Sequence, residues 1–338
     1  MTPELRGAGI IGIGAFAPEK VLTNSDLEKI VDTTDEWIVT RSGIRERHIV
    51  EDGMAASDLA FRASERALAS ASVSPEEIDL IICATVTGDV PFPSTSCILQ
   101  HRIGAVNAAA FDLQAGCSGW VYALATATQF VRTGVYERVL VVGVEVLSSV
   151  TDWADRATCV LFGDAAGAAV VAPMPIGTGV LATYLGADGA GGNLLRVEAG
   201  GSKLPPSEET VRNHQHYIRM EGREVYKFAV RIMAEASLKV LEMSGLTSQD
   251  IGLFIPHQAN IRIIDAAADR LKLPAEKVFV NVERYGNTSA ASIPLALAEA
   301  YESGRLEKGD IVLVVGFGAG LTWAAGVLKW TMQSRKKT

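Results

Sequence analysis

At residues 112–119 the chain reads Asp-Leu-Gln-Ala-Gly-Cys-Ser-Gly, a single cysteine in a run of small residues between two apolar segments. Residues 107–113 are short and apolar, which predicts a buried strand. Residues 120–132 form an apolar run that predicts a core helix ending at Gly134. Cys117 is therefore predicted to lie at a strand-to-helix turn.

The predicted position of Cys117 indicates chemistry as well as structure. A thiol at the start of a helix lies near unpaired N–H groups and the positive end of the helix dipole, which predicts a pKa below the ordinary value of about 8.5. The flanking Gly116 and Gly119 let the backbone turn sharply and let a ligand approach. Taken alone, the residue also fits a buried structural cysteine.

Two pairs of segments resemble each other at a common offset of 173 residues. Residues 68–81 align with residues 241–254, and Val139-Leu-Val-Val-Gly143 aligns with Val312-Leu-Val-Val-Gly316. Chance similarity between apolar strands explains either match alone. Two matches at one offset and in the same order favour an internal duplication.

The duplication predicts two halves, residues 1–174 and 175–338, which meet in the Pro- and Gly-rich segment 172–179. Each half alternates strand-like and helical patterns, which predicts an α/β fold with mostly parallel, buried sheets. The halves would pack face to face. Ligands in such folds bind beyond the carboxyl ends of the strands, where Cys117 is expected to lie.

Two polar residues of the second half are predicted at comparable places. A strand at residues 251–255 leads into His257. A strand at residues 278–282 leads into Asn287, which makes Asn287 roughly the counterpart of Cys117. A twofold relation between the halves would bring Cys117, His257 and Asn287 together. Taken singly, His257 also fits a core or capping histidine, and Asn287 a turn or helix-capping residue.

Composition and charge are those of an ordinary globular protein. The 338 residues are 48% hydrophobic and 21% charged, and the net charge of −8 argues against general binding of nucleic acid. The four cysteines, at positions 83, 97, 117 and 159, form no CxxC pair. They therefore indicate neither a disulfide framework nor a metal site, and they favour the reducing cytoplasm. No run approaches the roughly 18 apolar residues that span a bilayer.

Four motifs together resemble a known family. They are Gln-Ala-Gly-Cys-Ser-Gly around Cys117, Pro-His-Gln-Ala-Asn around His257, Tyr-Gly-Asn-Thr-Ser-Ala-Ala-Ser-Ile-Pro around Asn287, and Gly-Phe-Gly-Ala-Gly-Leu-Thr-Trp at residues 316–323. Their order and spacing are similar to those of the β-ketoacyl-acyl carrier protein synthase III family, of the thiolase superfamily, over residues 8–330. The resemblance implies a duplicated five-layer α/β/α/β/α fold, a homodimer, and an acyltransferase of fatty acid biosynthesis.

The resemblance also implies a reaction. Cys117 would take an acyl group from a short acyl-coenzyme A such as acetyl-coenzyme A. His257 and Asn287 would then promote decarboxylation of malonyl-acyl carrier protein, because their N–H groups can stabilise the thioester oxygen without quenching the carbanion. The backbone N–H groups of Cys117 and Ala319 would hold the oxyanion formed during acyl transfer, although the family often has glycine at position 319. No permanently bound cofactor and no metal are expected.

Further residues match the coenzyme A site of the family. Trp37 and Arg41 lie in a segment that resembles the one contacting the nucleotide, and Arg156 matches the arginine that faces the tryptophan across the adenine. Indole and guanidinium planes both stack on an aromatic base, which suits such a pair. Without the resemblance, these residues also fit a charged surface turn with one packed tryptophan.

Three positions, Gly222, Tyr226 and Asn260, match the wall of the pantetheine tunnel of the family. Tyr226 places a hydroxyl where the family commonly has phenylalanine. Phe92 matches the residue that crosses the dimer interface to close the acyl pocket of the partner subunit. It also fits an ordinary loop aromatic.

Four basic residues predict a docking surface for an acidic carrier protein near the tunnel mouth. Lys227 and Arg262 flank the tunnel positions, and Arg270 and Lys272 lie two to three turns beyond Arg262 on the same predicted helix. Such a local patch is compatible with the negative net charge of the whole chain. The expected partners are acyl-coenzyme A, malonyl-acyl carrier protein and a second copy of the chain, with no nucleic acid and no membrane.

Other enzyme classes fit the sequence less well. Residues 12–17, Gly-Ile-Gly-Ala-Phe-Ala, match the spacing of an NAD-dependent dehydrogenase, but that motif needs a helix at its glycines, and the first helical pattern begins near Asn24. A degradative thiolase would carry a second cysteine where Phe317 and Ala319 stand, and elongating synthases would carry histidine at position 287. A secondary-metabolic condensing enzyme of the same Cys-His-Asn type is the main alternative.

Overall fold

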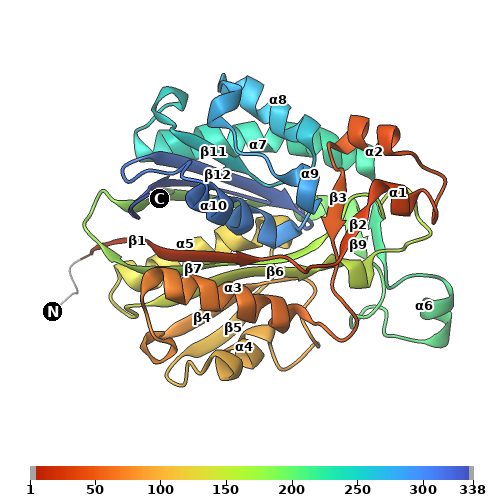
Figure 1. The fold of residues 1–338 in the computed structure, drawn as a ribbon, viewed down its shortest axis with the longest axis horizontal. Coiled ribbons are helices and arrows are strands. Elements are labelled where there is room, and N and C mark those ends of the chain that lie inside the picture. The colour runs from red at the N-terminus through yellow and green to blue at the C-terminus, as the bar shows by residue number, and fades with distance from the viewer. Residues whose placement is uncertain (1–4, 335–338) are drawn as a thin grey trace.

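Two half-sheets lie one above the other in the structure, a computed structural model that describes residues 5–334. A single residue pair joins them, Ala8 of β1 and Gly179 of β8. Helices α5 and α10 lie between the half-sheets, α3 and α4 cover the lower one, and α7 and α8 cover the upper one (Figure 1). The predicted α/β fold with five layers in the order α/β/α/β/α is confirmed.

The first half contributes five strands in the order β5-β4-β6-β7-β1. Its main elements are β1 Gly7–Phe16, α3 Ala56–Ala71, β4 Leu80–Ala84, α4 Thr95–Ile103, β5 Ala109–Leu113, α5 Gly119–Arg132, β6 Val139–Val146 and β7 Asp164–Met174. Helix α5 buries residues around most of its circumference, as expected for a helix between two sheets. Strand β6 is buried along its whole length because layers cover both of its faces.

The second half contributes four strands in the order β11-β12-β13-β8. Its main elements are β8 Gly179–Ala187, α7 Gly222–Ser244, β11 Leu253–Pro256, α8 Ile261–Leu271, α10 Ser292–Glu302, β12 Ile311–Gly318 and β13 Thr322–Lys329. Helix α8 buries the face that includes Ile264 and Ala267 and exposes the face that includes Arg262 and Arg270. This pattern is that of an outer-layer helix.

Shorter elements project from the layers, on the right of Figure 1. They are β2 Val21–Thr23, α1 Asn24–Leu27, α2 Asp35–Ser42, β3 Glu46–His48, β9 Leu195–Val197, α6 Glu208–Arg212, β10 Ile218–Met220 and α9 Val282–Tyr285. Strands β2 and β3 pair with each other, as do β9 and β10. Among the described residues, no helix is long and apolar enough to cross a membrane.

The glycines of β1 serve helix packing. A Cβ at Gly12 or Gly14 would collide with the backbone of α3 at Ala67, so this helix lies directly on the strand. After β1 the chain passes through β2 to α1, which begins at Asn24 as predicted. Within the described residues no helix begins at residues 12–17, so the structure lacks the helix that the dehydrogenase motif requires.

The offset of 173 residues extends through the secondary structure. The 3₁₀ turn Gly116–Ser118 before α5 corresponds to the 3₁₀ turn Ser289–Ala291 before α10. The first residue of each turn has a left-handed backbone, with φ of 52° in the first half and 48° in the second. By the same offset, Cys117 corresponds to Ala290. The predicted equivalence of Cys117 and Asn287 is therefore wrong by three residues.

The prediction of mostly parallel sheets is wrong. Within residues 5–334, the pairs β4–β5, β4–β6 and β11–β12 are parallel, together with the single contact between β1 and β8. The pairs β1–β7, β6–β7, β12–β13 and β13–β8 are antiparallel. A short connection explains one of these pairs. Three residues join β12 to β13, and so short a link allows only an antiparallel pair.

The predicted strand at residues 278–282 is reduced to an isolated parallel bridge to β11. The side chain of Gln258 accepts a hydrogen bond from the N–H of Asn281 at 2.9 Å and donates to the carbonyl of Phe279 at 3.1 Å. These bonds occupy backbone groups that a longer strand would use in its ladder. The chain then enters α9 directly.

Strand β5 was predicted to be buried, and this is wrong. It lies at the edge of its half-sheet, and its residues are half-buried or exposed. The predicted boundary between the halves falls in the turn from β7, which ends at Met174, to β8, which begins at Gly179. The predicted halves 1–174 and 175–338 include residues 1–4 and 335–338, which lie outside the described residues.

Candidate active site

Cys117 follows β5, in the middle of the turn that leads into α5. Gly116 has a φ of 52°, and a Cβ added to it would lie 2.8 Å from the backbone nitrogen of Ala319. A Cβ added to Gly318 would collide with the backbone nitrogen of Cys117. The two glycines therefore let the backbone nitrogens of Cys117 and Ala319 come close together.

Hydrogen bonds between the two halves hold this turn in place. The hydroxyl of Thr322 in β13 donates to the carbonyl of Ala115 at 2.8 Å, and the hydroxyl of Ser118 donates to the same carbonyl at 2.7 Å. The two hydroxyl oxygens are 2.9 Å apart. A residue of the second half thus fixes the backbone just before Cys117.

The thiol of Cys117 opens onto a mostly apolar cavity of about 440 Å³. Both halves contribute to its lining, which consists of Val86, Thr87, Gln114, Ala115, Gly116, Cys117, Leu147, Val150, Phe162, Leu195, Arg196, Val197, Ile218, Ser289, Ala319, Gly320 and Thr322. Strands β9 and β10 contribute apolar side chains to it. The cavity therefore provides an apolar chamber next to the sulfur.

The surroundings of Cys117 disfavour its ionisation. Burial raises the pKa of Cys117 to about 12, a hydrogen bond from Ser289 opposes this rise, and the negative charge of Glu145 adds to it. The predicted lowering of this pKa by the start of α5 is therefore not found, because burial shifts the pKa in the opposite direction. Near neutral pH the residue is a thiol, and its proton must leave during any reaction at the sulfur.

His257 follows β11 and is almost fully buried, with 1% of its surface exposed. Its backbone N–H donates to the carbonyl of Val315 at 2.7 Å, and its Nδ1 is 2.6 Å from the hydroxyl oxygen of Ser292. Burial lowers the pKa of His257 to about 3, so the ring is neutral near pH 7. When Ser292 donates to Nδ1, the ring proton lies on Nε2, which is then a hydrogen-bond donor.

Asn287 lies between α9 and α10, and the first half fixes its backbone. Its N–H donates to the carbonyl of Leu161 at 2.8 Å, and the N–H of Gly163 donates to its carbonyl at 3.1 Å. The side-chain oxygen of Asn287 accepts a hydrogen bond from the backbone N–H of Ser289 at 2.9 Å. This bond assigns the oxygen end of the amide, so the other end is an NH₂ group that can donate.

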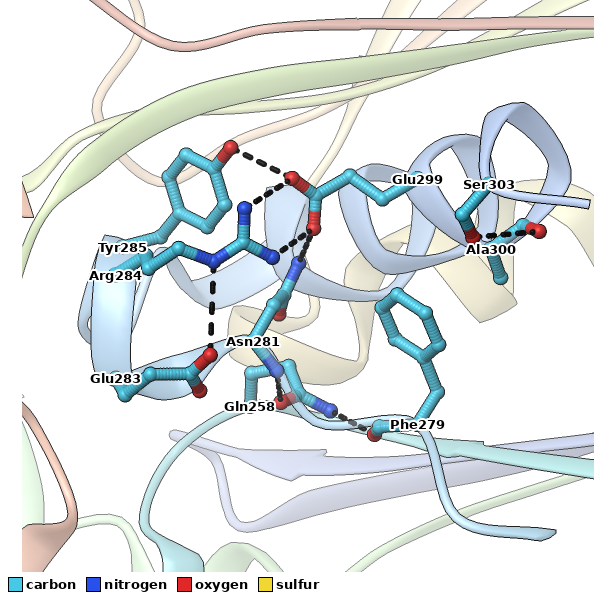
Figure 2. A network of polar contacts seen from close by, with 9 residues as sticks. All are labelled: Gln258, Phe279, Asn281, Glu283, Arg284, Tyr285, Glu299, Ala300 and Ser303. Atoms are coloured by element: carbon cyan, nitrogen blue, oxygen red, sulfur yellow. Dashed lines mark hydrogen bonds and ion pairs between the residues drawn. The ribbon is translucent and has the colours of Figure 1, made fainter. Parts of the chain in front are cut away.

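A carboxylate on α10 holds the segment before Asn287 in place (Figure 2). Glu299 accepts hydrogen bonds from Asn281 at 2.7 Å, from Tyr285 at 2.7 Å and from Arg284 at 3.0 and 3.1 Å. Its side chain is 19% exposed, so these bonds are only partly screened by water. Four donors therefore fix α9 on α10 just before the Asn287 loop.

The same network reaches the residue next to His257. Gln258 accepts from the N–H of Asn281 at 2.9 Å, and its NH₂ group donates to the carbonyl of Phe279 at 3.1 Å (Figure 2). The same NH₂ group donates to the carbonyl of Pro256 at 2.8 Å. Through Asn281, the loop that carries His257 is coupled to α9 and α10. One polar network therefore positions both loops.

The three predicted catalytic residues converge on one short segment, Ser289–Ser292. Ser289 bonds the thiol of Cys117 through its hydroxyl and the side chain of Asn287 through its N–H. Ser292 bonds the ring of His257. The turn that contains Ser289 packs against the turn that contains Cys117. The structure thus places Cys117, His257 and Asn287 around one segment, Ser289–Ser292, while the lining of the cavity at Cys117 includes Ser289 but neither His257 nor Asn287.

Trp37, Arg41 and Arg156 also lie together. The guanidinium carbons of Arg41 and Arg156 are 4.5 and 4.8 Å from the centre of the Trp37 ring. Arg156 forms an ion pair with Asp32 at 3.5 Å, and 45% of its side chain is exposed. A base stacked between Trp37 and Arg156 needs about 7 Å, which is twice a van der Waals contact. Arg156 must therefore move outward before a base can enter between them.

The three predicted tunnel positions lie at the starts of α7 and α8. Gly222 is exposed, and Tyr226 is half-buried with the guanidinium carbon of Arg262 5.3 Å from its ring centre. The side-chain oxygen of Asn260 accepts from the N–H of Arg262 at 2.9 Å, and its NH₂ group donates to the carbonyl of Arg41 at 2.8 Å. Asn260 therefore caps α8 and ties it to the end of α2.

The four predicted docking residues fall into two groups. Lys227 and Arg262 lie beside Tyr226, whereas Arg270 and Lys272 lie at the other end of α8, about 12 Å from Arg262 along the helix axis. The exposed face of α8 between Arg262 and Arg270 carries two acids. The basic patch predicted from the sequence is therefore interrupted by negative charge.

Phe92 lies in the loop before α4, and 86% of its surface is exposed. Two more apolar side chains near the edge of the same half-sheet are also exposed, Val90 by 48% and Val106 by 72%. Helix α4 packs on the edge strand β5, whose residues are themselves incompletely covered. Three exposed apolar side chains thus lie near this edge of the half-sheet.

Sequence reasoning missed Glu145 and Ser289. Glu145 lies in β6 and is fully buried, and its carboxylate accepts hydrogen bonds from the N–H of Val86 at 3.1 Å and the hydroxyls of Thr87 and Ser289 at 2.5 and 3.1 Å. Burial raises the pKa of Glu145 to about 7. The signal was present in the sequence, because this glutamate is the one charged residue in the strand Val139–Val146.

All four cysteines lie within the described residues, and none forms a disulfide. Within residues 5–334, no group of three or more His, Cys, Asp or Glu side chains could hold a metal ion. Two fused α/β halves, with a cysteine at the start of a central helix and a histidine and an asparagine supplied by the second half, define the thiolase fold with the site of a condensing acyltransferase.

Comparisons with known proteins narrow this class to one family. Residues 111–195 match the sequence model of 3-oxoacyl-[acyl-carrier-protein] synthase III, and residues 241–330 match the model of its C-terminal part. The β-ketoacyl-[acyl-carrier-protein] synthase III of Caldanaerobacter subterraneus subsp. tengcongensis is 60% identical over 328 residues, which cover 97% of this chain and 99% of that protein.

Two solved structures agree with this result. The crystal structure of 3-oxoacyl-[acyl-carrier-protein] synthase III from Aquifex aeolicus VF5 is 48% identical, with a TM-score of 0.89 over 96% of this chain and 100% of that chain. The priming β-ketosynthase of the R1128 polyketide pathway is 39% identical, with a TM-score of 0.91 over 98% of each chain. The chain belongs to the β-ketoacyl-acyl carrier protein synthase III family of fatty acid biosynthesis and is an acyltransferase.

Proposed function

We propose that the protein condenses a short acyl-coenzyme A with malonyl-acyl carrier protein, by way of an acyl group carried on Cys117. The observation that carries this proposal is the segment Ser289–Ser292, which contacts Cys117, His257 and Asn287 at once. One sulfur and two hydrogen-bond donors at the same place serve an acyl transfer followed by a decarboxylation. The condensation begins fatty acid biosynthesis.

Acyl transfer to Cys117 is the first half-reaction. The sulfur bonds to the carbonyl carbon of the acyl thioester, and the sulfur of coenzyme A leaves with the electron pair of the broken C–S bond. Negative charge builds up on the carbonyl oxygen before this bond breaks. The neighbouring backbone N–H groups of Cys117 and Ala319 are the donors for this oxyanion. Alanine at position 319 keeps the donor because it belongs to the backbone.

Decarboxylation of the malonyl group starts the second half-reaction. Its C–C bond to the carboxylate breaks, carbon dioxide leaves, and negative charge spreads onto the thioester oxygen. Nε2–H of the neutral His257 and the NH₂ group of Asn287 are donors for this oxygen. The carbanion then bonds to the acyl carbon on Cys117, whose sulfur leaves with the electron pair of its C–S bond.

Coenzyme A is held by the residues that the family resemblance identified. Trp37 supplies the stacking face for the adenine, and Arg156 closes over the base once it has moved away from the indole. Arg41 completes the cluster around Trp37. Gly222, Tyr226 and Asn260 line the path of the pantetheine arm, and Tyr226 and Asn260 contribute polar groups to its wall. Acyl-coenzyme A is a substrate, and no permanently bound cofactor or metal is required by these steps.

Malonyl-acyl carrier protein docks beside the start of α8. Lys227 and Arg262 lie next to the tunnel position Tyr226 and form the near part of the docking surface. Arg270 and Lys272 form the far part, about 12 Å further along α8. The two acids between these groups would repel an acidic partner, so its contacts would be limited to the near and far parts of the docking surface. The protein binds no nucleic acid and no membrane in this role.

The working form is a homodimer in the cytoplasm. The free edge of β5 and the exposed Phe92, Val90 and Val106 support pairing with a second copy, because a monomer rarely exposes so much apolar surface. In the dimer Phe92 closes the acyl cavity of the partner subunit. Each subunit consists of two thiolase-like halves, residues 1–174 with Cys117 and residues 175–338 with His257 and Asn287. Four unpaired cysteines support a reducing compartment.

A condensation assay with purified components tests this function. The protein is mixed with malonyl-acyl carrier protein and with acetyl-coenzyme A or longer straight and branched donors, and the acyl carrier protein is analysed by mass spectrometry. A cavity of about 440 Å³ predicts the highest turnover with short donors. Absence of a β-ketoacyl product with every donor, from a protein that still takes up acyl groups, would contradict the proposed acceptor.

A second candidate function is priming of a secondary-metabolic pathway. The similarity to the priming β-ketosynthase of a polyketide pathway, at 39% identity, supports this second candidate function. The chemistry on Cys117 is the same in both cases, so the carrier protein distinguishes them. Faster turnover with the carrier protein of a polyketide synthase than with that of fatty acid synthesis would support this second candidate.

A further inference from the structure

Glu145 is a charged residue that the reaction described above does not use. It lies near the end of β6, with no exposed surface, close to the loop that follows β4. The parallel strands β4 and β6 end at the edge of the sheet where Cys117 lies. A fully buried carboxylate is costly unless it is bonded, so its retention at this edge calls for an explanation.

Ser289 connects this carboxylate to the thiol. Its hydroxyl donates to Oε1 of Glu145 at 3.1 Å. Ser289 and Cys117 line the same cavity on two turns that pack together, and Ser289 lowers the pKa of the Cys117 thiol by hydrogen bonding. A hydroxyl has one proton, so it can donate in only one of these directions at a time. When Ser289 donates to Glu145 it accepts from the thiol, and when Glu145 is protonated Ser289 can donate to a thiolate.

We propose that Glu145 accepts, through the hydroxyl of Ser289, the proton that leaves Cys117 when the acyl group is transferred to it. This inference rests on the proposed role of Cys117 as the acyl acceptor. Ser289 contacts the reacting sulfur, and Glu145 acts through Ser289 and positions its hydroxyl.

Protons and electrons balance in this step. The S–H bond of Cys117 breaks as its sulfur bonds to the acyl carbon, and the proton passes to the oxygen of Ser289. The original hydroxyl proton of Ser289 passes to Oε1 of Glu145. Coenzyme A leaves as a thiolate while one carboxylate becomes neutral, so the total charge is unchanged and no further reactant is needed.

His257 is the alternative proton acceptor within the site, and it is a less suitable base than Glu145. Burial lowers the pKa of His257 to about 3, whereas burial raises the pKa of Glu145 to about 7. A base works best when its pKa lies near the working pH. The neutral His257 is thereby left as a hydrogen-bond donor for the second half-reaction.

The backbone of Ser289 supports a site-specific role. It has a φ of 48°, in the left-handed region that non-glycine residues rarely occupy, and the equivalent residue of the first half is Gly116. A serine at such a position costs conformational energy that a glycine avoids. Its hydroxyl, bonded to both Glu145 and Cys117, is the group that a glycine could not supply.

The titratable groups around Glu145 come from several elements. Glu145 acts on two thiols, Cys83 of β4 and Cys117, and the carboxylates of Asp112 in β5 and Asp89 in the loop after β4 also act on Cys83. Strand β7 places Ala165 opposite Glu145. The neighbouring Asp164 of β7 is bonded to Ser148 and to the N–H of Val50. Helices α3 and α5 pack on β6. On α3, Asp58 forms an ion pair with Arg102, Arg62 forms an ion pair with Glu65, and Arg66 donates to the carbonyl of Ala15. On α5, Tyr122 donates to the carbonyl of Gly186, and the last turn carries Arg132.

The rate of acetylation of Cys117 by acetyl-coenzyme A in a single turnover, measured as a function of pH, tests this proposal. The wild-type rate should rise with pH and reach half of its plateau near pH 7, because only the carboxylate form of Glu145 accepts a proton. Each pH unit below that value should slow acetylation about tenfold. Glu145→Gln should lower the rate at pH 7 by about 10²–10⁴-fold and lose the half-maximum near pH 7, because the remaining reaction through the thiolate keeps rising as pH increases.

Two further variants keep the test decisive. Asp164→Asn removes another buried carboxylate, on the neighbouring strand, and should keep the wild-type rise with pH. Ser289→Ala leaves Glu145 in place and breaks the connection, so it should lose the half-maximum near pH 7 even if Glu145→Gln does not fold. Circular dichroism establishes that each variant is folded.

The possible failures are distinguishable. If the wild-type protein takes up no acetyl group on Cys117 at any pH, both the proposed function and this inference fail. If the wild type is acetylated, and folded Glu145→Gln or Ser289→Ala follows the same pH profile, the proposed function stands and the proton route through Ser289 is overturned.

Discussion

The side-chain oxygen of Asn287 accepts a hydrogen bond from the backbone N–H of Ser289 at 2.9 Å, and this bond sets which end of the amide faces the site. The NH₂ end is left as a donor. In the proposed reaction a donor at this place serves decarboxylation, in which charge develops on the malonyl thioester oxygen. The proposed oxyanion site for acyl transfer is separate and consists of the backbone N–H groups of Cys117 and Ala319.

Replacement of Asn287 should therefore separate the two half-reactions. Asn287→Asp keeps the oxygen that Ser289 bonds and removes the NH₂ group, and Asn287→Ala removes both. Each should slow decarboxylation of malonyl-acyl carrier protein by about 10²–10³-fold, the usual cost of one such donor, and leave acetylation of Cys117 nearly unchanged. Carbon dioxide release and single-turnover acetylation measure the two steps. A larger defect in acetylation than in decarboxylation would contradict the proposed role of Asn287 in stabilising the carbanion.

Loss of the indole of Trp37 should weaken binding of coenzyme A. Trp37→Ala removes the face that the guanidinium groups of Arg41 and Arg156 cover, and it should raise the KM for acyl-coenzyme A by an amount equivalent to roughly 1–3 kcal/mol of stacking. Trp37→Phe retains an aromatic face and should give a smaller rise. An unchanged KM in a stable Trp37→Ala protein would assign this residue to the core only.

Salt should slow turnover with the carrier protein more than it slows acetylation by acetyl-coenzyme A. Turnover with malonyl-acyl carrier protein should fall as ionic strength rises, and more steeply than acetylation of Cys117, because docking depends on Lys227 and Arg262. Arg262→Glu should raise the KM for the carrier protein. Lys239→Glu, a charge reversal of the same size further along α7, is the matched control. Equal salt dependence of both half-reactions would argue against this docking surface.

Truncation of Glu299 should destabilise the protein and disturb the loop that carries Asn287. Glu299→Ala leaves the donors of Asn281, Arg284 and Tyr285 without their acceptor, which should cost about 1–3 kcal/mol in the free energy of unfolding. Decarboxylation should decline more than acetylation. Glu302→Ala, an exposed acid of the same helix, should change neither quantity. Urea unfolding with the two half-reaction assays measures these effects, and unaltered stability in Glu299→Ala would contradict the network.

Much of the architecture could be predicted from a repeat in the sequence. Two matches at an offset of 173 residues indicated the duplication, and the same offset relates the turns before α5 and α10. Apolar runs at Val139–Val146 and at residues 120–132 were sufficient to place a buried strand and a central helix, because burial on all sides leaves a continuous apolar pattern. The positions of Cys117 and His257 after strands followed from the apolar runs at residues 107–113 and 251–255, which correspond to β5 and β11.

Other features depend on tertiary contacts that no local pattern contains. The strand predicted at residues 278–282 is lost because the side chain of Gln258, distant in sequence, takes its backbone bonds. The pKa of Cys117 is raised by burial among residues of both halves, which only the folded structure brings together. The role of Glu145 becomes visible only when Ser289 is brought beside it.

The central claim is that Cys117 carries the acyl group, and the most direct measurement is the mass of the intact protein after incubation with acetyl-coenzyme A, followed by peptide mapping. The account predicts one acetyl group per chain, located on Cys117, and none on a folded Cys117→Ala protein. An acetyl group on the exposed Cys97, or undiminished acetylation of Cys117→Ala, would contradict it.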